Sequence, residues 1–473
     1  MIIKQLYTSC LSEAAYYISS NGEAAIIDPL RETKPYLNLL KSDSSCLKYI
    51  FLTHFHADFI SGHVDLAEAT GAKIVYGPTA SADFDFYQGK DGEIFKLGNI
   101  EIKLIHTPGH TLESICLLLF DKSGKEHCLF SGDTVFIGDV GRPDLAVTEH
   151  LTKEDLARLL FRSIHAKILP LPDNIIIYPN HGKGSACGKS MSDKTFDTLL
   201  SQKEKNYALD SKLTEEVFVE KVLSGLLTPP QYFSKNAKMN KQINKNVNEV
   251  IAKGLTPLTI TQFLRYSGYE DILLLDVRSA KEFADGHIPG AIFIGLEGFF
   301  APLVGALIQD INQKIILVAP KARELEAIIR LSRIGYDNVI GYIEDGSKYW
   351  ENKGLKLDQL KSVKASSKIL LQNPHLIDVR ENRKYEVSHA KNAQNIPIKF
   401  IRNNNLNPNI KYYVYCNKGY LSTIAISIFK KLGVTNLVNI IGGFEEIQKS
   451  HVPVYNKECS CTECNCKKFA ELN

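Results

Sequence analysis

The chain has 473 residues, and its 56 basic and 53 acidic side chains nearly cancel to a formal charge of +3. This balance gives no electrostatic footprint for nucleic acid or for an anionic membrane surface, so neither is expected as a partner. Hydrophobic residues make up 44% and charged residues 23%, which excludes wholesale disorder, collagen and coiled coil, and the length predicts about three domains.

No apolar run approaches the roughly 20 residues that cross a bilayer, and the start of the chain lacks a basic segment followed by an apolar one. A cytoplasmic protein is therefore expected, in which cysteines stay reduced. The ten cysteines are at positions 10, 46, 116, 128, 187, 416, 459, 461, 464 and 466.

Short apolar runs alternate with turn signals through the amino-terminal part of the chain. Buried strands are expected at Leu47–Leu52, Ile100–Ile105, Ser114–Phe120, Cys128–Phe130 and Asn174–Tyr178. Helical periodicity is expected at Val64–Thr70 and Lys153–Ile164. This alternation predicts a mixed α/β domain over residues 1–235.

Histidines and carboxylates directly follow several of these strands. Because strand ends on one edge of a layered α/β fold converge, these side chains are expected to lie together. Imidazole and carboxylate ligands suit Zn, Fe or Mn, and the residues alone do not choose among the four histidines. The set is His54, His56, Asp58, His110, Asp133 and His181.

The segment THFHADFISGH at 53–63, with the later His, Asp and His, resembles the metallo-β-lactamase superfamily over about residues 1–235. The resemblance implies an αββα sandwich with metals at one edge. Phe59 stands where the superfamily motif H-x-H-x-D-H has its last His, and a phenyl ring cannot ligate a metal. This difference disfavours a two-metal hydrolase of the glyoxalase II type.

Further stretches resemble the persulfide dioxygenase branch: HTPGHT, FSGDTVFIGDVGRPDL and RSIHAKILPLPDNIIIYPNHG. The resemblance implies one Fe(II) per chain, held by His54, His110 and Asp133, with Zn as another occupant in isolated protein. The rest of the set then lies around these ligands or replaces one of them: His56, Asp58 and His181. Two His and one carboxylate leave open positions on iron for a persulfide and O2.

Three other residues of this domain are substrate-binding candidates. Arg142 is interpreted either as a fork for a carboxylate or phosphate of the carrier thiol or as a loop ion pair with Asp144. Tyr178 either hydrogen-bonds iron-bound species or packs in its strand. Cys187, in a Gly-rich loop, either carries sulfane sulfur or is an inert thiol.

The second half of the chain begins with a shift in composition and contains an internal repeat. Residues 236–254 are rich in Lys and Asn and are interpreted as a linker, or as a solvated helix, at a domain boundary. Leu274–Arg278 (LLDVR) recurs as Leu376–Arg380 (LIDVR), and each copy is followed by a His segment and a Lys-led apolar strand. Two small parallel α/β domains are expected, at 255–355 and 360–455.

Cys416 ends an apolar strand and begins a loop before a helical stretch, where backbone N–H groups favour a thiolate and any anion attached to it. The LIDVR, Cys-loop and IIGGFEE segments resemble a rhodanese, which implies that Cys416 carries sulfane sulfur, with Lys418, Gly419 and Ser422 around it. Leu421 stands where rhodanese loops often carry Arg, which leaves the acceptor open.

The 255–355 copy resembles the rhodanese signature but has no cysteine, and Ala319, or Val318 in the other register, stands at the nucleophile position. It is interpreted as a structural or docking module. The tail at 456–473 carries C-x-C-x2-C-x-C, which is interpreted as a thiol-rich disordered segment, with Zn or Cu(I) binding or sulfur relay as alternatives.

Together these features predict a persulfide dioxygenase–rhodanese fusion that detoxifies sulfide. Its partners are expected to be a persulfide of glutathione, coenzyme A or a similar small thiol, then O2, sulfite and thiosulfate, and other copies of the chain in a homo-oligomer. The alternative enzyme is a zinc-dependent thioesterase or glyoxalase II type hydrolase with a sulfurtransferase domain. A non-enzymatic alternative is a sulfide-sensing scaffold.

Overall fold

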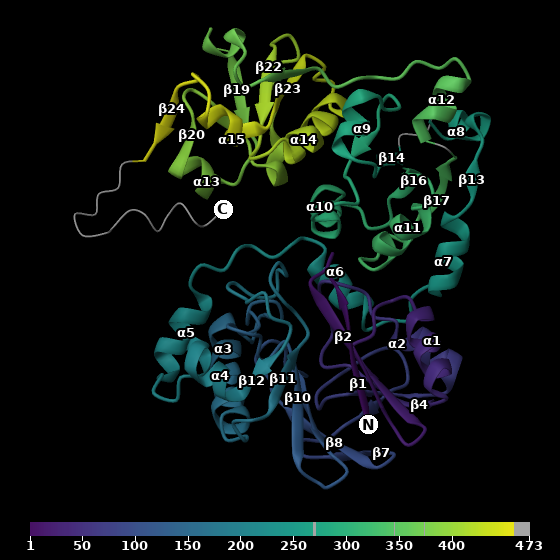
Figure 1. The fold of residues 1–473 in the computed structure, drawn as a ribbon, viewed down its shortest axis with the longest axis vertical. Helices are drawn as coiled ribbons and strands as arrows, with labels where there is room; N and C mark the ends of the chain where they lie inside the picture. The colour runs from purple at the N-terminus through teal and green to yellow at the C-terminus, as the bar shows by residue number, and fades with distance from the viewer. Residues whose placement is uncertain (268–270, 345, 373, 458–473) are drawn as a thin grey trace. The chain divides into compact units, whose positions relative to one another are not determined.

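The structure is a computed structural model, and it describes residues 1–267, 271–344, 346–372 and 374–457 (Figure 1). Its contacts divide the chain into two compact units. The first unit consists of Met1–Leu255, Gly298–Gln313 and Leu325–Val339. The second consists of Thr256–Glu297, Lys314–Glu324 and the described residues from Ile340 onward. Within the described residues, no helix has the length and apolar character needed to cross a membrane.

Two six-stranded sheets form the centre of the first unit. The first sheet has, in spatial order, β1 Ile2–Thr8, β2 Glu13–Ser20, β3 Glu23–Ile27, β4 Cys46–Phe51, β5 Lys73–Tyr76 and β6 Tyr87–Gln88. The second has β12 Asp197–Thr198, β11 Ile176–Pro179, β10 Glu126–Gly132, β9 Ile115–Phe120, β8 Ile100–His106 and β7 Ile94–Leu97. Both sheets contain parallel and antiparallel pairs of strands.

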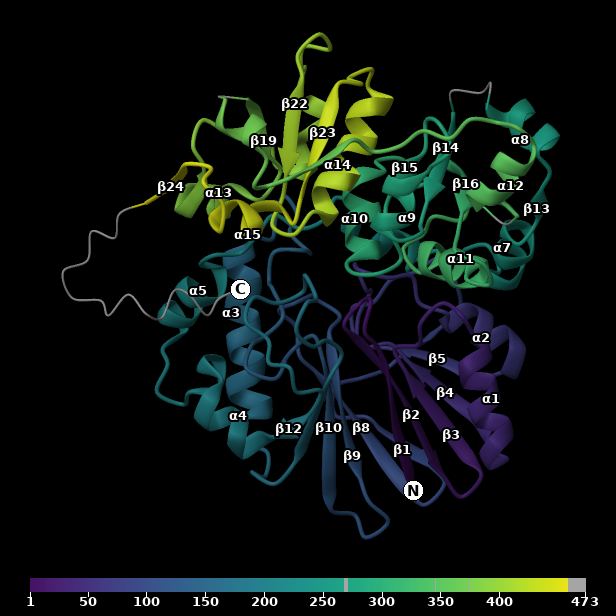
Figure 2. The same ribbon diagram turned by 45° about the horizontal axis from the view of Figure 1, so that its top comes forward.

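Helices cover the outer face of each sheet, as Figure 2 shows. α1 Lys34–Asp43 and α2 His63–Thr70 lie outside the first sheet; α3 Lys153–Ser163, α4 Leu199–Lys205 and α5 Glu215–Leu223 lie outside the second. The apolar faces of the sheets meet in one core, which includes Tyr16, Leu117 and Phe130. The αββα sandwich implied by the sequence resemblance is therefore confirmed.

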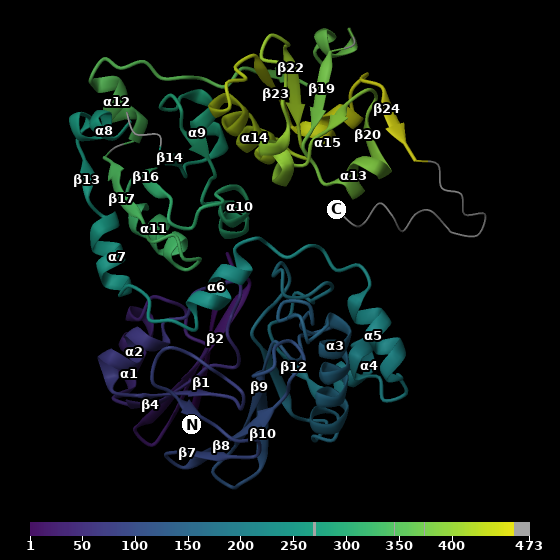
Figure 3. The same cartoon turned by 180° about the vertical axis from the view of Figure 1, so that it is seen from behind.

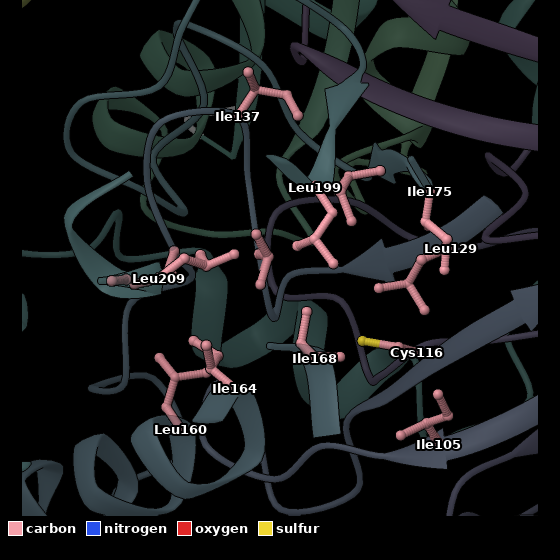
Figure 4. Close-up of a cluster of buried hydrophobic side chains, with 14 of the residues drawn as sticks. Ile105, Cys116, Leu129, Ile137, Leu160, Ile164, Ile168, Ile175, Leu199 and Leu209 are labelled. Carbon is pink, nitrogen blue, oxygen red and sulfur yellow. The ribbon is translucent and has the colours of Figure 1, made fainter. Parts of the chain in front are cut away.

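The helix α3 shows how local sequence fixes this arrangement. Thr152 caps it, because its side chain accepts a hydrogen bond from Asp155 N while the Asp155 side chain accepts from Thr152 N. Its buried residues Leu156 and Leu160 are one helical turn apart, so they form a single apolar face. This face joins the core beneath the second sheet, where Figure 4 shows Leu160 among Ile164 and Ile168.

The segment 236–254, interpreted from composition as a linker or solvated helix, folds into the end of α6 Phe233–Met239 and into α7 Val247–Gly254. It is not a solvated tether, because Asn236 and Asn240 are fully buried. Composition gives no signal of this, since a buried asparagine such as Asn240, whose side chain bonds to backbone groups, looks the same in sequence as an exposed one.

Each copy of the internal repeat builds a five-stranded sheet in which the paired strands run parallel. The first copy contains β13 Pro257–Leu258, α8 Ile260–Ser267, β14 Ile272–Asp276, α9 Ala280–Asp285, β15 Ile292–Phe293, α10 Phe300–Leu307, β16 Lys314–Val318, α11 Glu324–Ser332, β17 Val339–Ile343 and α12 Gly346–Asn352. Its helices α10 and α11 lie almost entirely in the first compact unit.

The second copy contains β18 Ser362–Lys364, β19 His375–Asp378, α13 Asn382–Val387, β20 Ser388–Ala390, β21 Gln394–Asn395, β22 Tyr412–Tyr415, α14 Tyr420–Lys431, β23 Leu437–Ile441, α15 Gly443–Gln448 and β24 Val454–Asn456. Figure 3 shows α14 beside β22 and β23. The tail cysteines Cys459, Cys461, Cys464 and Cys466 lie outside the described residues.

Strand register settles which residue of the first copy replaces the cysteine. Asp276 pairs with Val318 in the first copy, and Asp378 pairs with Tyr415 in the second. Val318 is thus the counterpart of Tyr415, and Ala319 occupies the position of Cys416. Of the two registers left open by the sequence, the structure shows the one with Ala319.

Candidate metal centre and cysteine loop

All six side chains of the histidine and carboxylate set are buried in the first unit. They come from loops that follow strands, as expected. His54, His56 and Asp58 lie in the loop after β4, and the other three members follow β8, β10 and β11: His110, Asp133 and His181.

His54, His110 and Asp133 form one compact group whose ligand atoms lie within 4.8 Å of one another. His110 Nε2 is 3.4 Å and His54 Nε2 is 3.9 Å from Asp133 Oδ2. Both buried oxygens of Asp133 have no hydrogen-bond partner among the described residues. Two imidazoles facing an unpartnered buried carboxylate are a donor set that fits a divalent metal ion.

Backbone and hydroxyl groups orient the two imidazoles. His110 Nδ1 donates to the Arg142 carbonyl at 2.9 Å, which leaves Nε2 as the ligand atom. Thr53 Oγ1 donates to Asp28 Oδ2 and accepts from His54 Nδ1 at 3.0 Å, with the same result. Burial and the neighbouring imidazoles lower the pKa of His54 well below its usual value, so its ring is neutral and can coordinate a metal.

A second group lies beside the first and contains a residue that the motif did not include. Asp58, His181 and Cys187 also bring ligand atoms within 4.8 Å of one another. His181 Nε2 lies 3.4 Å from Asp58 Oδ2 and 3.5 Å from Asp133 Oδ1, so Asp133 adjoins both groups. Geometry thus associates Asp58 and His181 with a different set of ligands from His54 and His110.

Cys187 is 1% exposed, and its loop is held by the Asp139 carboxylate, which accepts hydrogen bonds from Lys189 N and Ser190 N. Burial and the Asp58 carboxylate raise the pKa of the Cys187 thiol well above its usual value. A buried thiol of raised pKa is a poor nucleophile, which agrees with the inert interpretation unless a metal binds to it.

Asp28, which sequence reasoning missed, holds one ring nitrogen of His56, whereas the other, Nδ1, is buried and has no hydrogen-bond partner among the described residues. His56 Nε2 lies 2.9 Å from Asp28 Oδ1. Burial alone would lower the pKa of His56, but the Asp28 carboxylate overcomes this and raises it. The available signal was a carboxylate directly after the apolar strand β3, in the sequence IIDP.

The loop after β4 is also fixed by groups from distant segments. Asn240 Nδ2 donates to the carbonyls of His56 and Phe59, and Asn240 Oδ1 accepts from Ser61 N. The Phe59 ring is fully buried and stacks on the His56 ring, with centroids 4.3 Å apart. Phe59 is therefore a packed residue at the place where the superfamily motif has a histidine.

Arg142 and Tyr178 both make structural contacts. The Arg142 guanidinium is buried, pairs with both oxygens of Asp144 and donates to the carbonyl of Ala186. The Tyr178 ring stacks on Phe130 at 5.5 Å within the core between the sheets. Each nitrogen of the Arg142 guanidinium thus already has an acceptor within the chain, the last being the Leu227 carbonyl.

Cys416 directly follows β22 and faces the start of α14. Its Sγ accepts a hydrogen bond from Gly419 N at 3.1 Å and lies 3.7 Å from Ser422 Oγ. The Ser422 hydroxyl has nearer acceptors in Asn439 Oδ1 at 2.7 Å and the Gly419 carbonyl at 3.0 Å. The Lys418 side chain is 75% exposed, and its Nζ lies 3.6 Å from Glu445 Oε1, which also accepts from Asn417 Nδ2. Three of the expected residues thus surround the sulfur or its loop.

The IIGGFEE segment, residues 440–446, packs against the backbone of this loop. Phe444 N donates to the Cys416 carbonyl at 2.7 Å. Gly443 has a φ of +60°, and a Cβ added there would lie 2.4 Å from the Cys416 carbonyl oxygen. Glycine is required at this position because both its conformation and the close approach exclude a side chain.

The repeated DVR and His motifs are structural in both copies. Arg278 pairs with Asp276 and Arg380 pairs with Asp378, all four being buried. The His rings stack on an aromatic residue four positions earlier, His287 on Phe283 and His389 on Tyr385. These motifs predict the fold and not the reaction.

Comparison with known proteins places each part of the chain. Residues 9–181 match the metallo-beta-lactamase superfamily, and 259–353 and 359–450 each match the rhodanese-like domain. The mitochondrial persulfide dioxygenase ETHE1 of Mus musculus is 33% identical over 185 residues, which are 38% of this chain and 68% of that protein.

Two further relatives differ in their described activity. A probable hydroxyacylglutathione hydrolase of Schizosaccharomyces pombe is 33% identical over 162 residues, 34% of this chain and 59% of that protein, so the chain spans less than two thirds of its length. A crystal structure of a metallo-beta-lactamase from Staphylococcus aureus subsp. aureus COL has 33% identity and a TM-score of 0.62, and it covers 72% of this chain and 98% of that one.

Dioxygenase and hydrolase relatives are equally similar, so the comparisons alone do not choose between these two reactions. They agree on the metallo-beta-lactamase fold of the amino-terminal part. The chain belongs to the metallo-beta-lactamase superfamily and carries two rhodanese-like domains after its metallo-beta-lactamase domain.

Proposed function

We propose that this chain oxidises low-molecular-weight thiol persulfides with O2 to sulfite and the free thiol, and that its second rhodanese-like domain transfers sulfane sulfur through Cys416. The overall conversion is RSSH + O2 + H2O to RSH, sulfite and two protons. Sulfide detoxification would be its physiological use.

The supporting observation is the group of His54, His110 and Asp133, in which two imidazoles and one carboxylate converge while Phe59 fills the place of a further histidine. These three residues would hold one Fe(II) per chain. Bound iron would supply one-electron chemistry with O2, which zinc cannot supply because it has no accessible redox change.

The residues of this chain prepare the site in three ways. The Arg142 carbonyl and Thr53 hydroxyl hold the imidazoles with Nε2 available for a metal. Asp28 fixes the His56 ring through its Nε2. The burial of the whole set limits the access of bulk water, which protects a persulfide from side reactions.

The second reaction would use the hydrogen bonds around Cys416. A persulfide on Cys416 would lie at the start of α14, where the Gly419 N–H that now bonds to Sγ would stabilise its negative charge. Attack of sulfite on this outer sulfur breaks the S–S bond, forms thiosulfate and leaves the Cys416 thiolate. Ala319 cannot perform this step, so the first copy is proposed to have no sulfurtransferase activity.

A specific observation favours a second candidate function. Asp58, His181 and Cys187 form a group that could hold another metal ion next to the first. Two zinc ions in these groups would suit a thioesterase or glyoxalase II type hydrolase. The Cys187→Ser variant discriminates, because it should lower the zinc content only if Cys187 is a ligand.

The test is oxygen consumption and sulfur-product analysis on anaerobically purified, iron-loaded protein with a thiol persulfide. We expect about one iron per chain, O2 uptake and sulfite or thiosulfate as products. About two zinc ions per chain, together with thioester hydrolysis and no O2 uptake, would replace this proposal with the hydrolase.

Cytoplasmic location and a homo-oligomeric state remain parts of the proposal. All six cysteines within the described residues are free, as expected in a reducing compartment. Size-exclusion chromatography with light scattering would determine the oligomeric state.

A further inference from the structure

A cavity of about 220 Å³ opens beside the metal-ligand groups in the first unit. Asp58, which is 5% exposed, lies on its buried side, and Phe299, which is 64% exposed, lies on its open side. The cavity therefore connects solvent with a member of the Asp58, His181 and Cys187 group.

Asp58 brings a carboxylate with an unpartnered oxygen to the lining of this cavity. Its Oδ2 lies 3.4 Å from His181 Nε2, whereas its buried Oδ1 has no hydrogen-bond partner among the described residues. An unpartnered buried carboxylate oxygen costs free energy unless a ligand, water or ion meets it. A molecule in the cavity would thus have one end next to the metal-ligand groups.

The chemistry of the lining restricts what can bind. The described residues that line the cavity include no Lys, Arg or His. Its apolar wall consists of Tyr232, Phe233, Phe299 and Pro302, and its small polar groups come from Ser9, Ser12 and Ser185. This lining fits an uncharged organic chain better than a cluster of anionic groups.

Part of that wall comes from the rhodanese-like copy that lacks a cysteine. Gly298, Phe299 and Pro302 lie at the start of α10, within residues that match the rhodanese-like domain. α10 packs closely on the cavity, because a Cβ added at Gly305 would lie 2.0 Å from the ring of Tyr232. Figure 3 shows α10 next to α6, which follows Tyr232.

Buried ion pairs hold this part of the copy in the first unit. Arg31, 2% exposed, donates to both oxygens of Asp337, and Arg333 pairs with Glu32. Ile60 N in the metal-ligand loop donates to the Arg333 carbonyl at 2.6 Å. Separating these groups would leave uncompensated buried charges, so the wall is a fixed part of the site.

We propose that the cysteine-less rhodanese-like domain supplies Phe299 and Pro302 as the wall that binds the organic carrier of the persulfide, and that it thereby sets substrate specificity. This inference rests on the proposed function for the identity of the substrate. The carrier is an uncharged organic group adjoining the persulfide, in contact with the Phe299 ring.

The test compares Phe299→Ala with the wild-type chain on two substrates, N-acetylcysteamine persulfide and inorganic hydrogen disulfide. Loss of the ring should lower kcat/KM about tenfold for the organic persulfide, chiefly through a higher KM. It should leave kcat/KM for hydrogen disulfide within about twofold, since that substrate has no carrier. Phe299→Leu, which keeps an apolar side chain, should retain most of the wild-type kcat/KM for the organic persulfide.

Phe196→Ala is the matched control, because Phe196 is 53% exposed in the same unit and does not line the cavity. This variant should keep the wild-type kcat/KM for both substrates. Equal kcat/KM for wild type and Phe299→Ala with the organic persulfide would overturn the inference. An equal loss on both substrates would also overturn it, since the effect would not depend on the carrier.

A binding measurement separates this inference from the proposed function. Saturation-transfer NMR with S-methyl-N-acetylcysteamine, an inert thioether, should show about tenfold weaker binding to Phe299→Ala. If the wild-type chain consumes no O2 but binds the thioether more tightly than Phe299→Ala does, the proposed reaction is wrong and the role of Phe299 in binding is supported. If the wild-type chain consumes O2 and Phe299→Ala binds the thioether equally well, the proposed role of Phe299 is wrong and the proposed reaction stands.

Discussion

The carboxylate of Asp28 accepts a hydrogen bond from His56 Nε2 at 2.9 Å, although the two residues follow different strands. The same carboxylate accepts from both the backbone N and the hydroxyl of Thr53, and from Asn180 Nδ2. Asp28 thus joins the loops after β3, β4 and β11. It fixes the geometry of a metal centre to which it donates no ligand.

Asp28→Ala should therefore lose metal and stability together. It leaves the Thr53 and Asn180 donors and the His56 ring buried without their acceptor, at a cost of about 3–5 kcal/mol. Asp28→Asn should be milder, because asparagine tolerates the φ of 49° at this position and keeps one acceptor oxygen. Metal analysis and chemical unfolding of the two variants would measure both effects.

The control is Asp144→Asn, which alters the buried ion pair with Arg142 without touching Asp28. It should retain its metal. Full metal content in Asp28→Ala would show that the loops keep their geometry without this carboxylate.

The sequence predicted the site residues that belong to a pattern and missed those that do not. His54, His110 and Asp133 follow strands within a recognisable order, so their convergence could be expected. Asn240 gives no such signal, because its bonds to His56 and Phe59 carbonyls exist only once the chain has folded. Pairing of Asp276 with Val318 likewise had to be seen before Ala319 could be aligned with Cys416.

The two proposed reactions should be separable by single substitutions. His110→Ala removes a ligand atom that lies 3.4 Å from Asp133, so it should abolish O2 uptake. Cys416→Ser should leave O2 uptake unchanged and shift the product from thiosulfate toward sulfite, because the sulfur-carrying thiol is lost. An oxygen electrode and chromatographic analysis of sulfur anions would test both variants, and loss of O2 uptake in Cys416→Ser would contradict this division of roles.

A contact between the two rhodanese-like copies should stabilise the loop that carries Cys416. Tyr420, the first residue of α14, donates its hydroxyl to the Gly295 carbonyl at 3.0 Å and meets the Phe293 ring edge-on. Tyr420→Phe removes only the hydrogen bond and should cost about 0.5–1.5 kcal/mol of loop stability. We expect a few-fold lower rate of sulfur transfer from thiosulfate to cyanide, with O2 uptake unchanged.

Tyr455→Phe is the control for this substitution, because Tyr455 is exposed and lies in β24, away from the residues that contact Tyr420. It should transfer sulfur at the wild-type rate. An unchanged rate in Tyr420→Phe would mean that the cysteine-less copy does not position the loop through this bond.

Acid should loosen the cysteine-less copy before the pH reaches 4. Burial lowers the pKa of His287 to about 4, below its value of about 6.5 in an unfolded chain. The unfolded state then binds a proton that the folded state does not, so stability is full above about pH 6.5 and falls as the pH drops toward 4. Hydrogen exchange of peptides around α9 and β15, measured from pH 7 to 4.5 and corrected for intrinsic rates, should show this loss.

His287→Gln is the control, because glutamine cannot titrate but can still donate to the Phe283 carbonyl. This variant should be less stable than the wild type at pH 7, and its stability should decline less steeply as the pH falls. Parallel pH profiles for the two proteins would show that another group causes the acid sensitivity.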